Sequence, residues 1–394
     1  MEMRVRSGGH DFEGSSYISR VPFFVLDMYN FRSIVVDSDS KTAWMGVGLT
    51  LGETYYKINE KKTTLACPAG YWPSVGVGGH IGAGGYVILS YKVRLFEVPV
   101  RVSGFNVKRT LEQGAIQLVH KWQQISPKMP VKLGLTVQLY SIVNSAESGK
   151  KTILTEFITT YRGGINQLLS IMRRYFPELG VTRKDCQEMP WIKSYPFSLG
   201  VPIDDNNNLN VKDFLTNRGS LGDPSGFKWK VDFTEDPIPP EGLEKIFSKL
   251  HEVPPMTAQL GWTILGGGIM DKIPESRIPF PHRRKLMVMR HVVFWNKNDT
   301  SVVAQTRIDW MQQLHRIIGP YVPNNPRAAY AGYRDFELGV NVVENRDQTS
   351  DVENARMWGS AYFKNNFDRL VRVKSLVDPQ NFLKSEQSIP ILQR

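Results

Sequence analysis

Two glycine-rich stretches, each containing a histidine, constrain the N-terminal part of this chain more than any other sequence feature. Residues 6–14 read RSGGHDFEG, and residues 76–85 read GVGGHIGAGG. Paired glycines let a backbone approach a ligand or another backbone without interference from Cβ atoms. Because Val75, Val77 and Ile81 punctuate the second stretch, we expect packed glycines there and not a flexible linker. The first stretch, taken alone, also fits a tight turn with a solvated histidine.

The second stretch matches neither of the two common phosphate-binding glycine motifs. It lacks the GxGxxG order of a dinucleotide-binding turn and the GK[ST] ending of a P-loop. Its successive N–H groups could still hold a pyrophosphate. A histidine beside such glycines can hydrogen-bond, coordinate a metal or form a covalent bond, so the motif indicates a binding site of undefined ligand.

Length and composition indicate a globular protein with more than one domain. The chain has 394 residues, of which 41% are hydrophobic and 22% charged. Its net charge is +11, but the charges are scattered, without zinc-finger spacing or a basic helix. We therefore expect no nucleic-acid partner.

Several other classes of protein are disfavoured. Cys67 and Cys186 are the only cysteines, so we expect no disulfide framework, and no bridge between these two. The seven histidines have no metal-site spacing, and no GxSxG hydrolase elbow occurs. No run of about 18 apolar residues predicts a membrane span. The chain opens on a motif without a hydrophobic signal region, from which we expect upstream sequence to be missing.

The hydrophobic pattern predicts two regions with different arrangements of strands and helices. The first hundred residues predict short strands and one helix, which Thr50 and Glu53 open as a capping box. From about residue 105, strands alternate with helices, which predicts an α+β fold with an antiparallel sheet backed by helices on one face. The predicted strands lie at 21–28, 33–47 (a hairpin), 87–98, 133–140, 152–160, 259–265 and 286–295. The predicted helices lie at 50–60, 111–124, 165–175, 242–251 and 302–318, with further helix in 352–378.

Several long motifs together resemble one family. In order they are RSGGHDFEGSSY (6–17), CPAGYWPSVGVGGHIGAGGY (67–86), YAGYRDFELG (330–339), WGSAYFKNNFDRLVRVKSLVDPQNF (358–382) and EQSIP (386–390). These resemble the plant berberine bridge enzyme-like flavoproteins, FAD-linked oxidases of the vanillyl-alcohol-oxidase (PCMH) type. The resemblance implies a bipartite FAD-binding domain, here 1–103 and 352–394, around a substrate-binding domain at 104–351.

The resemblance also implies how FAD would be held. His10 falls on the histidine that bonds covalently to the flavin in the family, whereas Trp72 stands where doubly linked members have a cysteine. A single covalent link through His10 is therefore expected. Val75 falls on the position that controls oxygen access, which favours oxygen as the electron acceptor. The expected cofactor-binding residues are Gly8, Gly9, His10, Val75, Gly78, Gly79, His80 and Gly84.

The catalytic residues implied by the family are only partly present. Tyr333 and Tyr86 fall on active-site tyrosines, whereas Val288 occupies the position of the family's catalytic base and cannot accept a proton. Arg290, two residues further on the same strand, is the remaining polar candidate there. His291 should point to the opposite side of that strand, as a structural residue. Phe12 and Gly332 also depart from the tyrosine and asparagine that family members carry near the flavin.

A long segment of the family pattern is absent after Tyr86, so we expect an incomplete flavin domain with impaired activity. Two functions remain open: an FAD-dependent oxidoreductase acting on an alcohol or oligosaccharide, or a catalytically dead remnant or cell-wall sugar-binding module. The resemblance further implies a secreted or cell-wall monomer, and Asn298 begins the one glycosylation sequon. It does not identify the substrate.

Overall fold

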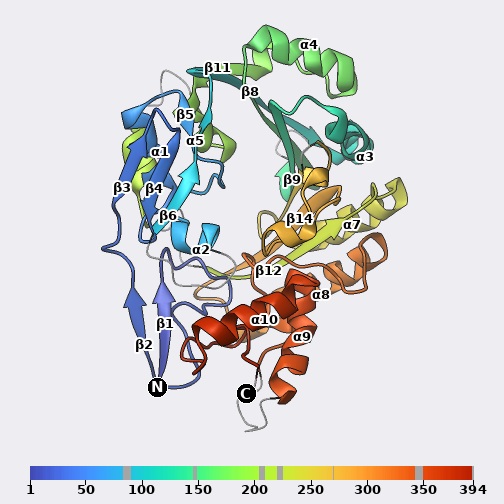
Figure 1. The fold of residues 1–394 in the computed structure, drawn as a ribbon. Helices are drawn as coiled ribbons and strands as arrows, with labels where there is room; N and C mark the ends of the chain where they lie inside the picture. Colours follow the sequence, from blue (N-terminus) through green and yellow to red (C-terminus); the bar gives the residue numbers. More distant parts are fainter. Residues whose placement is uncertain are drawn as a thin grey trace.

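The computed structural model describes residues 1–82, 90–144, 149–203, 209–219, 225–268, 270–341 and 349–392. Figure 1 shows the N-terminal strands and the first helix on one side of the molecule, a large sheet on the other, and the C-terminal helices beside the base of that sheet. We call residues 1–97 with 349–392 the flavin half, and residues 101–341 the sheet half.

The flavin half is built from small sheets. β1 and β2 pair in parallel, β3, β4 and β6 form an antiparallel sheet, and β5 pairs with β7. The strands are β1 Glu2–Arg6, β2 Phe23–Asp27, β3 Ile34–Asp37, β4 Thr42–Gly46, β5 Leu65–Ala66, β6 Ser90–Arg94 and β7 Phe96–Glu97. The helices before residue 100 are α1 Leu51–Lys61 and α2 Val77–Ile81.

Helix α1 begins where the sequence predicts it. The Glu53 N–H donates to Thr50 Oγ1 at 3.3 Å, and the Thr50 N–H donates to Glu53 Oε2 at 3.0 Å. This capping box pairs two N–H groups that an uncapped helix would leave without partners. The buried face of α1, which includes Leu51, Tyr55 and Ile58, packs into the core of the flavin half.

The sheet half contains one seven-stranded sheet, with the order β11-β8-β10-β9-β13-β14-β12. Its two sides repeat one arrangement: β8-α3-β9-β10-α4 along the chain is followed later by β12-α7-β13-β14-α8. Each unit orders its strands first, third, second, and the two second strands, β9 and β13, pair at the centre. The strands are β8 Arg101–Thr110, β9 Leu133–Asn144, β10 Lys150–Tyr161, β11 Cys186–Pro190, β12 Ser225–Thr234, β13 Ala258–Ile264 and β14 Met287–Asn296.

Four helices cover one face of this sheet and complete the main core. They are α3 Ala115–Ile125, α4 Ile165–Tyr175, α7 Pro240–Glu252 and α8 Ser301–Ile318. Trp122, Phe157, Trp262 and Phe247 are among the large side chains buried between these helices and the sheet. The predicted α+β architecture is thus confirmed, although the sequence analysis did not predict β8, β11 or β12.

The segment between β11 and β12 leaves the large sheet and packs against the flavin half. It contains α5 Ser194–Ser198 and α6 Val211–Thr216. The ring of Tyr195 stacks on that of Tyr55 in α1 with centroids 4.0 Å apart, and Leu215 is buried in the same cluster. Arg218, which follows α6, forms an ion pair with Glu53. The two halves therefore share part of the smaller core.

The C-terminal residues return to the flavin half. Helices α9 Thr349–Phe363 and α10 Asn366–Val377 pack through Trp358 and Phe367, whose ring centroids are 5.8 Å apart. The tail then reaches β1, where the buried Arg4 donates to the Lys384 carbonyl and pairs with Glu386, both at 3.0 Å. Short 3-10 helices occupy Leu111–Gln113, Ser126–Lys128, Pro177–Leu179, Arg183–Asp185, Trp191–Lys193, Met270–Lys272, Glu275–Arg277, Gly319–Tyr321 and Phe336–Leu338.

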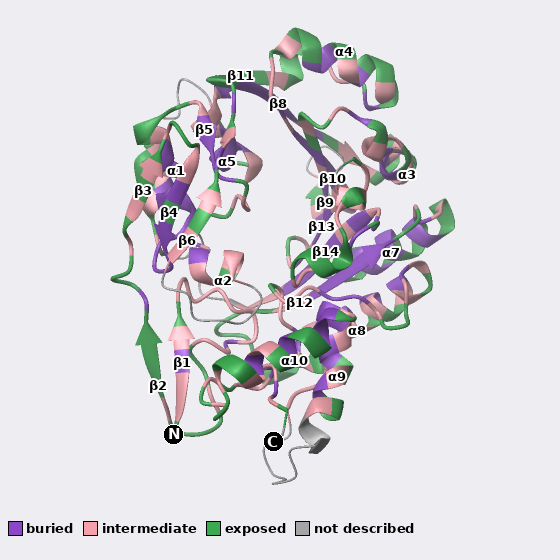
Figure 2. Cartoon of the chain, in the orientation of Figure 1, coloured by how far each residue is buried: buried purple, intermediate pink, exposed green. Residues whose placement is uncertain are grey.

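Burial is uneven between the two halves (Figure 2). In β2, which runs largely in green, Phe24 and Leu26 are exposed, as is Trp44 in β4. Both cysteines are free thiols, as predicted. Among the described helices, none is both long and apolar enough to cross a bilayer.

Candidate active site

The two glycine-rich motifs of the sequence lie against each other. A Cβ atom placed on Gly8 would lie 2.3 Å from the Gly76 nitrogen, and one on Gly76 would lie 2.2 Å from the Gly8 nitrogen. Ser7 Oγ fastens the contact: it donates to the Val47 carbonyl at 2.5 Å and accepts from the Gly78 N–H at 3.2 Å. These glycines are therefore packed, as the sequence predicts, and only glycine fits at both crossing positions.

His10 lies beside this crossing. Its Nε2 hydrogen-bonds Ser74 Oγ at 2.8 Å, and burial lowers its pKa, so the neutral imidazole is favoured. Gly9 has φ +70°, a conformation that suits glycine. The motif thus holds an uncharged histidine in a fixed turn, at the junction of the two glycine stretches.

His80 has a different role in the same region. Its Nε2 accepts a hydrogen bond from the Gly70 N–H at 3.2 Å, which ties helix α2 to the loop that precedes it. Burial lowers the pKa of His80. The neighbouring Gly79 faces open space, because a Cβ atom there would meet nothing within 4 Å.

The remaining flavin-motif residues are divided between core and surface. Val75 packs against the core of the flavin half, and its carbonyl accepts from the Leu51 N–H at 2.8 Å. Trp72 is exposed, whereas Cys67 is buried, and burial raises the pKa of its thiol to about 11. Gly84 and Tyr86 lie outside the described residues.

Arg290 lies on the uncovered face of the sheet, beside two tyrosines. Its Nη1 donates to the Tyr71 hydroxyl at 3.3 Å, and its Nη2 donates to Thr263 Oγ1 at 3.0 Å. It also hydrogen-bonds the hydroxyl of Tyr333. Arg290 thereby joins a loop of the flavin half, through Tyr71, to a tyrosine from near the C-terminus.

Strand register places a row of polar residues across this face. Lys108, Glu156, Gln138, Gly261 and Arg290 are successive neighbours on β8, β10, β9, β13 and β14. Glu156 pairs with Lys108 at 2.9 Å. The sequence analysis missed Glu156 and Gln138, although a polar residue at every second position of β9 marks one face as hydrophilic.

A second polar row adjoins the first. The Tyr140 hydroxyl donates to Gln138 and lies 3.3 Å from Glu156 Oε2, while Gln259 Nε2 donates to Gln138 Oε1. Burial, followed by the carboxylate of Glu156, raises the pKa of Tyr140 well above its usual value. This face of the sheet therefore offers hydroxyl, amide and carboxylate groups suited to polar ligands.

Tyr333 also belongs to an aromatic cluster that includes the flavin motif. Phe12 stacks on Tyr333 with centroids 5.1 Å apart and on Trp229 at 4.8 Å. Trp229 and Tyr333 are parallel within 3° and 5.7 Å apart. Residue 12 of the first motif thus meets the candidate catalytic tyrosine directly.

A cluster of ion pairs holds the first motif against the segment around Tyr333. Lys228 Nζ lies 2.8 Å from Glu13 Oε1 and 3.2 Å from Asp335 Oδ1, and Lys230 Nζ lies 2.5 Å from Asp335 Oδ2. Arg334 pairs with Asp11 at 3.0 Å. Burial opposes the charge on Lys228, but Asp335 and Glu13 outweigh it and raise its pKa. Residues 11–13 and 333–337 are thereby held together through β12.

The two strand neighbours of Arg290 behave differently. Val288 packs against an apolar cluster with Phe233 and Tyr333, so it offers no group that accepts a proton. His291 is fully buried in the helix-covered core, where burial lowers its pKa to about 4 although Asp232 opposes this effect. His291 is therefore a structural residue on the opposite side of the strand, as expected.

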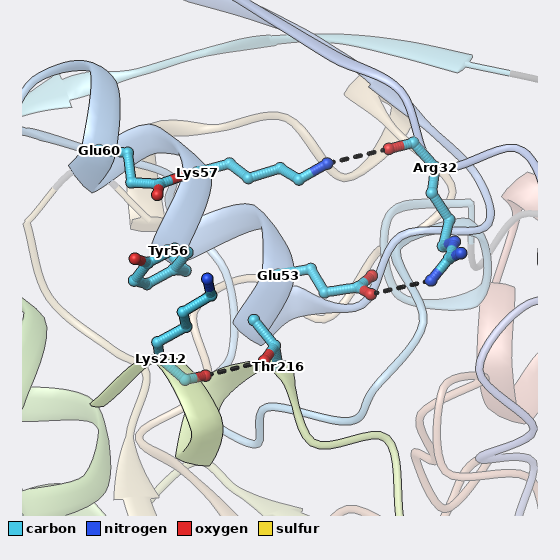
Figure 3. Close-up of a pocket in the computed structure, with 7 residues that line it drawn as sticks. All are labelled: Arg32, Glu53, Tyr56, Lys57, Glu60, Lys212 and Thr216. Atoms are coloured by element: carbon cyan, nitrogen blue, oxygen red, sulfur yellow. Dashed lines mark hydrogen bonds and ion pairs between the residues drawn. The ribbon is translucent and has the colours of Figure 1, made fainter. Parts of the chain in front are cut away.

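A separate surface pocket of about 430 Å³ lies between α1 and α6. Figure 3 shows Glu53, Tyr56 and Lys57 on α1 facing the side chains of Arg32 and Lys212. Arg32 already pairs with Glu53 at 3.6 Å, and Lys212 lies over the Tyr56 ring. None of its lining residues was a candidate site residue.

Comparison with known proteins identifies the family. Residues 1–97 match the model described as "FAD binding domain", and residues 329–390 match "Berberine and berberine like". Berberine bridge enzyme-like 24 of Arabidopsis thaliana is 38% identical over 443 residues, covering 99% of this chain and 79% of that protein. The chain belongs to the berberine bridge enzyme-like family of FAD-dependent oxidoreductases.

Solved structures agree with this assignment. Berberine bridge enzyme-like 28 from Arabidopsis thaliana superposes with a TM-score of 0.90 at 32% identity, covering 100% of this chain and 88% of that one. Phl p 4, a grass pollen allergen with glucose dehydrogenase activity, gives 0.88 at 32% identity, covering 100% and 86%. The PCMH-type flavoprotein fold expected from the sequence is confirmed.

The alignment length carries further information. The match to berberine bridge enzyme-like 24 extends over 443 positions, more than the 394 residues of this chain. It therefore includes positions that the relative fills and this chain does not, which agrees with the absence of a family segment expected from the sequence.

The residues present fit part of an FAD site. The crossed glycines leave open space at Gly79, and the hydroxyl oxygens of Ser15 and Ser16, directly after the first motif, are buried without a hydrogen-bond partner. Unpaired buried hydroxyls suit the phosphates of a dinucleotide, to which they can donate hydrogen bonds. Gly8, Gly78 and His10 therefore lie together, and Phe12 of the same motif stacks on Tyr333.

Proposed function

We propose that this protein oxidises a hydroxyl group of an alcohol or carbohydrate, with FAD as cofactor and oxygen as final acceptor. The observation that carries the proposal is the stack of Phe12, from the flavin motif, on Tyr333, from the sheet-half site. This contact supports the proposal because it brings the glycine-rich motif of residues 6–14 next to Tyr333, which hydrogen-bonds Arg290 on the polar face of the sheet. The glucose dehydrogenase activity of Phl p 4 supports a sugar as substrate.

Oxidation of an alcohol removes a hydride from carbon and a proton from the hydroxyl group. FAD, when bound, supplies a two-electron acceptor for the hydride. We propose Tyr333 as the group that takes the proton, with Tyr86 as a second candidate. For this step Tyr333 must first release its own hydroxyl proton to solvent, and the guanidinium of Arg290 beside it would stabilise the resulting phenolate until the substrate proton is transferred to it.

Gly8, Gly9, Gly78, Gly79 and Gly84 would bring backbone N–H groups to the cofactor, and His80 would hold the second loop in place. We propose His10 as the single covalent attachment point, since Trp72 cannot form a thioether. Val75, a modest side chain, would leave oxygen a path to the cofactor. The hydrogen bond to Ser74 engages only Nε2 of His10, so a link through Nδ1 would not require this bond to break.

The covalent link gives a direct test. Acid-precipitated wild-type protein is expected to retain flavin fluorescence in the pellet, and His10→Ala to lose it. Ser74→Ala serves as the matched control, because it removes the hydrogen-bond partner of His10 and leaves the imidazole itself. Flavin that remains in the His10→Ala pellet would refute the assignment.

The alternative function is a catalytically inactive remnant or a cell-wall sugar-binding module. It is favoured by the family positions that this chain lacks in its alignment with the relative, and by Val288 at the position of the family's catalytic base. Purified protein that is colourless, but binds sugars through the polar face of the sheet, would support this alternative.

We propose a secreted or cell-wall monomer. The sequon at Asn298 supports secretion, because it lies on an exposed turn after β14 where a glycan could attach. Asn298 glycosylation in plant-expressed protein, detected by mass spectrometry, would test this location.

A further inference from the structure

Arg290 differs from Arg218, Arg327 and Arg334 in the partners it has. Arg218 pairs with Glu53, Arg327 with Asp232 and Arg334 with Asp11, at 2.5, 2.6 and 3.0 Å. Arg290 instead contacts only uncharged groups: the hydroxyls of Tyr71, Tyr333 and Thr263, and the Gly261 carbonyl. Within the described residues, no carboxylate forms an ion pair with it.

An arginine in this setting retains its charge. A guanidinium stays protonated in proteins, and removing a charge from water is costly unless an opposite charge compensates it. Burial lowers the pKa of Arg290, but Tyr71 and Tyr333 outweigh burial, so its pKa lies above the usual value. The uncovered face of the sheet therefore carries a permanent positive charge without a counter-charge.

The nearest acid in the same row of the sheet is already engaged. Glu156 lies three strands from Arg290, with Gln138 and Gly261 between them in register. It pairs with Lys108 at 2.9 Å and lies 3.3 Å from the Tyr140 hydroxyl. Glu156 thus cannot serve both Lys108 and Arg290.

Gly261 determines how the guanidinium lies. A Cβ atom there would be 3.5 Å from Arg290 Nη2 and 3.8 Å from Cζ, so the guanidinium extends across β13 over the glycine. Its Nε meets the Gly261 carbonyl at 3.4 Å, a long and therefore weak hydrogen bond. An incoming group with two oxygens would exchange this weak contact for two charge-assisted hydrogen bonds.

We propose that Arg290 binds a carboxylate of the substrate, so that the preferred substrate is a hydroxylated acid: a sugar acid or another alcohol that bears a carboxylate. This inference rests on the proposed function, because it assigns the substrate class of the same site. A carboxylate fits the planar fork of the guanidinium, supplies the absent counter-charge, and fixes the substrate next to Tyr333.

The test compares matched acid and neutral ligands by ligand-observed NMR on the purified full chain. The pairs are glucuronate with glucose, and 4-(hydroxymethyl)benzoate with benzyl alcohol. In wild type, the acids are expected to bind about tenfold or more tightly than their neutral partners, as a charge-assisted pair contributes. Arg290→Gln should reduce this preference to about twofold or less, with neutral ligands unaffected.

Lys108→Gln is the matched control. It removes one positive charge from the same row of the sheet, but from a lysine that already has Glu156 as its partner. It should keep the preference for acids. Arg290→Lys keeps the charge without the fork and should retain an intermediate preference, which tests the inference even if Arg290→Gln does not fold.

The inference would be overturned if wild type binds no acid, if it binds acid and neutral partners with equal affinity, or if Lys108→Gln and Arg290→Gln lose the preference for acids equally. It would also be overturned if Arg290→Gln lowers flavin content and leaves acid binding unchanged, since Arg290 would then serve the cofactor. A flavin-carrying protein without acid preference overturns this inference alone. A flavin-free protein with Arg290-dependent acid preference supports it and refutes the proposed oxidation.

Discussion

The two halves of the molecule bury their side chains to very different extents. In the sheet half, seven strands and four helices enclose a continuous core that includes Trp122, Phe157 and Trp262. In the flavin half, the β3-β4-β6 sheet, β5 and α1 share a smaller core, while Phe24 and Trp44 remain exposed. The parallel pair β1–β2 has only two strands, although parallel strands are normally covered on both faces.

This difference indicates that the sheet half carries most of the stability of the chain. Apolar burial contributes about 25 cal/mol per Å² removed from water, so the larger core dominates. The flavin half instead depends on its contacts with other segments: Arg4 with the C-terminal tail, Glu53 with Arg218, and Phe12 with Tyr333. It holds the cofactor motifs on a structure of marginal stability.

The largest expected difference in stability is between alanine substitutions of one tryptophan in each half. Trp122 is fully buried and its Nε1 donates to the Leu135 carbonyl at 3.2 Å, whereas Trp44 is 51% exposed. Trp122→Ala should lower the free energy of unfolding by about 3–5 kcal/mol, and Trp44→Ala by about 0.5 kcal/mol. Urea denaturation of both variants would measure this. Equal losses would break the comparison.

A second pair of variants compares one buried carboxylate from each half. Asp232 is fully buried against Arg327, and Glu53 is mostly buried against Arg218. Asp232→Asn should cost about 3–5 kcal/mol, because it breaks an ion pair whose carboxylate is fully buried. Glu53→Gln should cost roughly 1–2 kcal/mol, because the Glu53 side chain keeps some exposure to solvent. A larger loss for Glu53→Gln, in the same denaturation experiment, would contradict the ranking.

Acid should weaken the sheet half through His291. Burial lowers the pKa of His291 to about 4, below the roughly 6.5 of an unfolded histidine, so the native state favours the neutral ring. Its contribution is complete above about pH 6.5 and is lost as the pH falls toward 4. The pKa of Asp232 is also lowered, by His315 and Arg327 against burial, so its contribution is lost at still lower pH.

The histidine contribution can be isolated with His291→Gln. The unfolding free energy of wild type should fall about 1.4 kcal/mol per pH unit more steeply than that of this variant across the histidine window. Identical slopes in denaturation curves collected between those pH values would show that His291 is not held neutral.

Much of the fold was readable from the sequence, because local rules govern the parts concerned. The Thr50–Glu53 capping box starts α1 where predicted, and the apolar periodicity of 302–318 matches α8. Strand β12 was missed although its sequence alternates apolar residues with Lys228, Lys230 and Asp232, a pattern that predicts a strand. Their partners, Asp335, Glu13 and Arg327, lie far away in the chain and only the folded structure brings them together.

The site divides in the same way. Motif resemblance made His10 and Tyr333 candidates, and the position two residues after Val288 made Arg290 one. It did not predict Tyr71 as a partner of Arg290, nor Glu156 as a member of its row. Such relations depend on strand register and domain packing, which a single sequence does not encode locally. The stack of Phe12 on Tyr333 follows from contacts between residues more than 300 positions apart.

The most direct test of the difference between the two halves is hydrogen exchange of the whole chain, followed by mass spectrometry under native conditions. Amides of β9, β10, β13 and β14 should exchange slowly, through global unfolding, whereas those of β1, β2 and β3 should exchange much faster, through local opening. Added FAD should slow the second group and leave the first unchanged. Uniform protection of both halves without FAD would contradict the account.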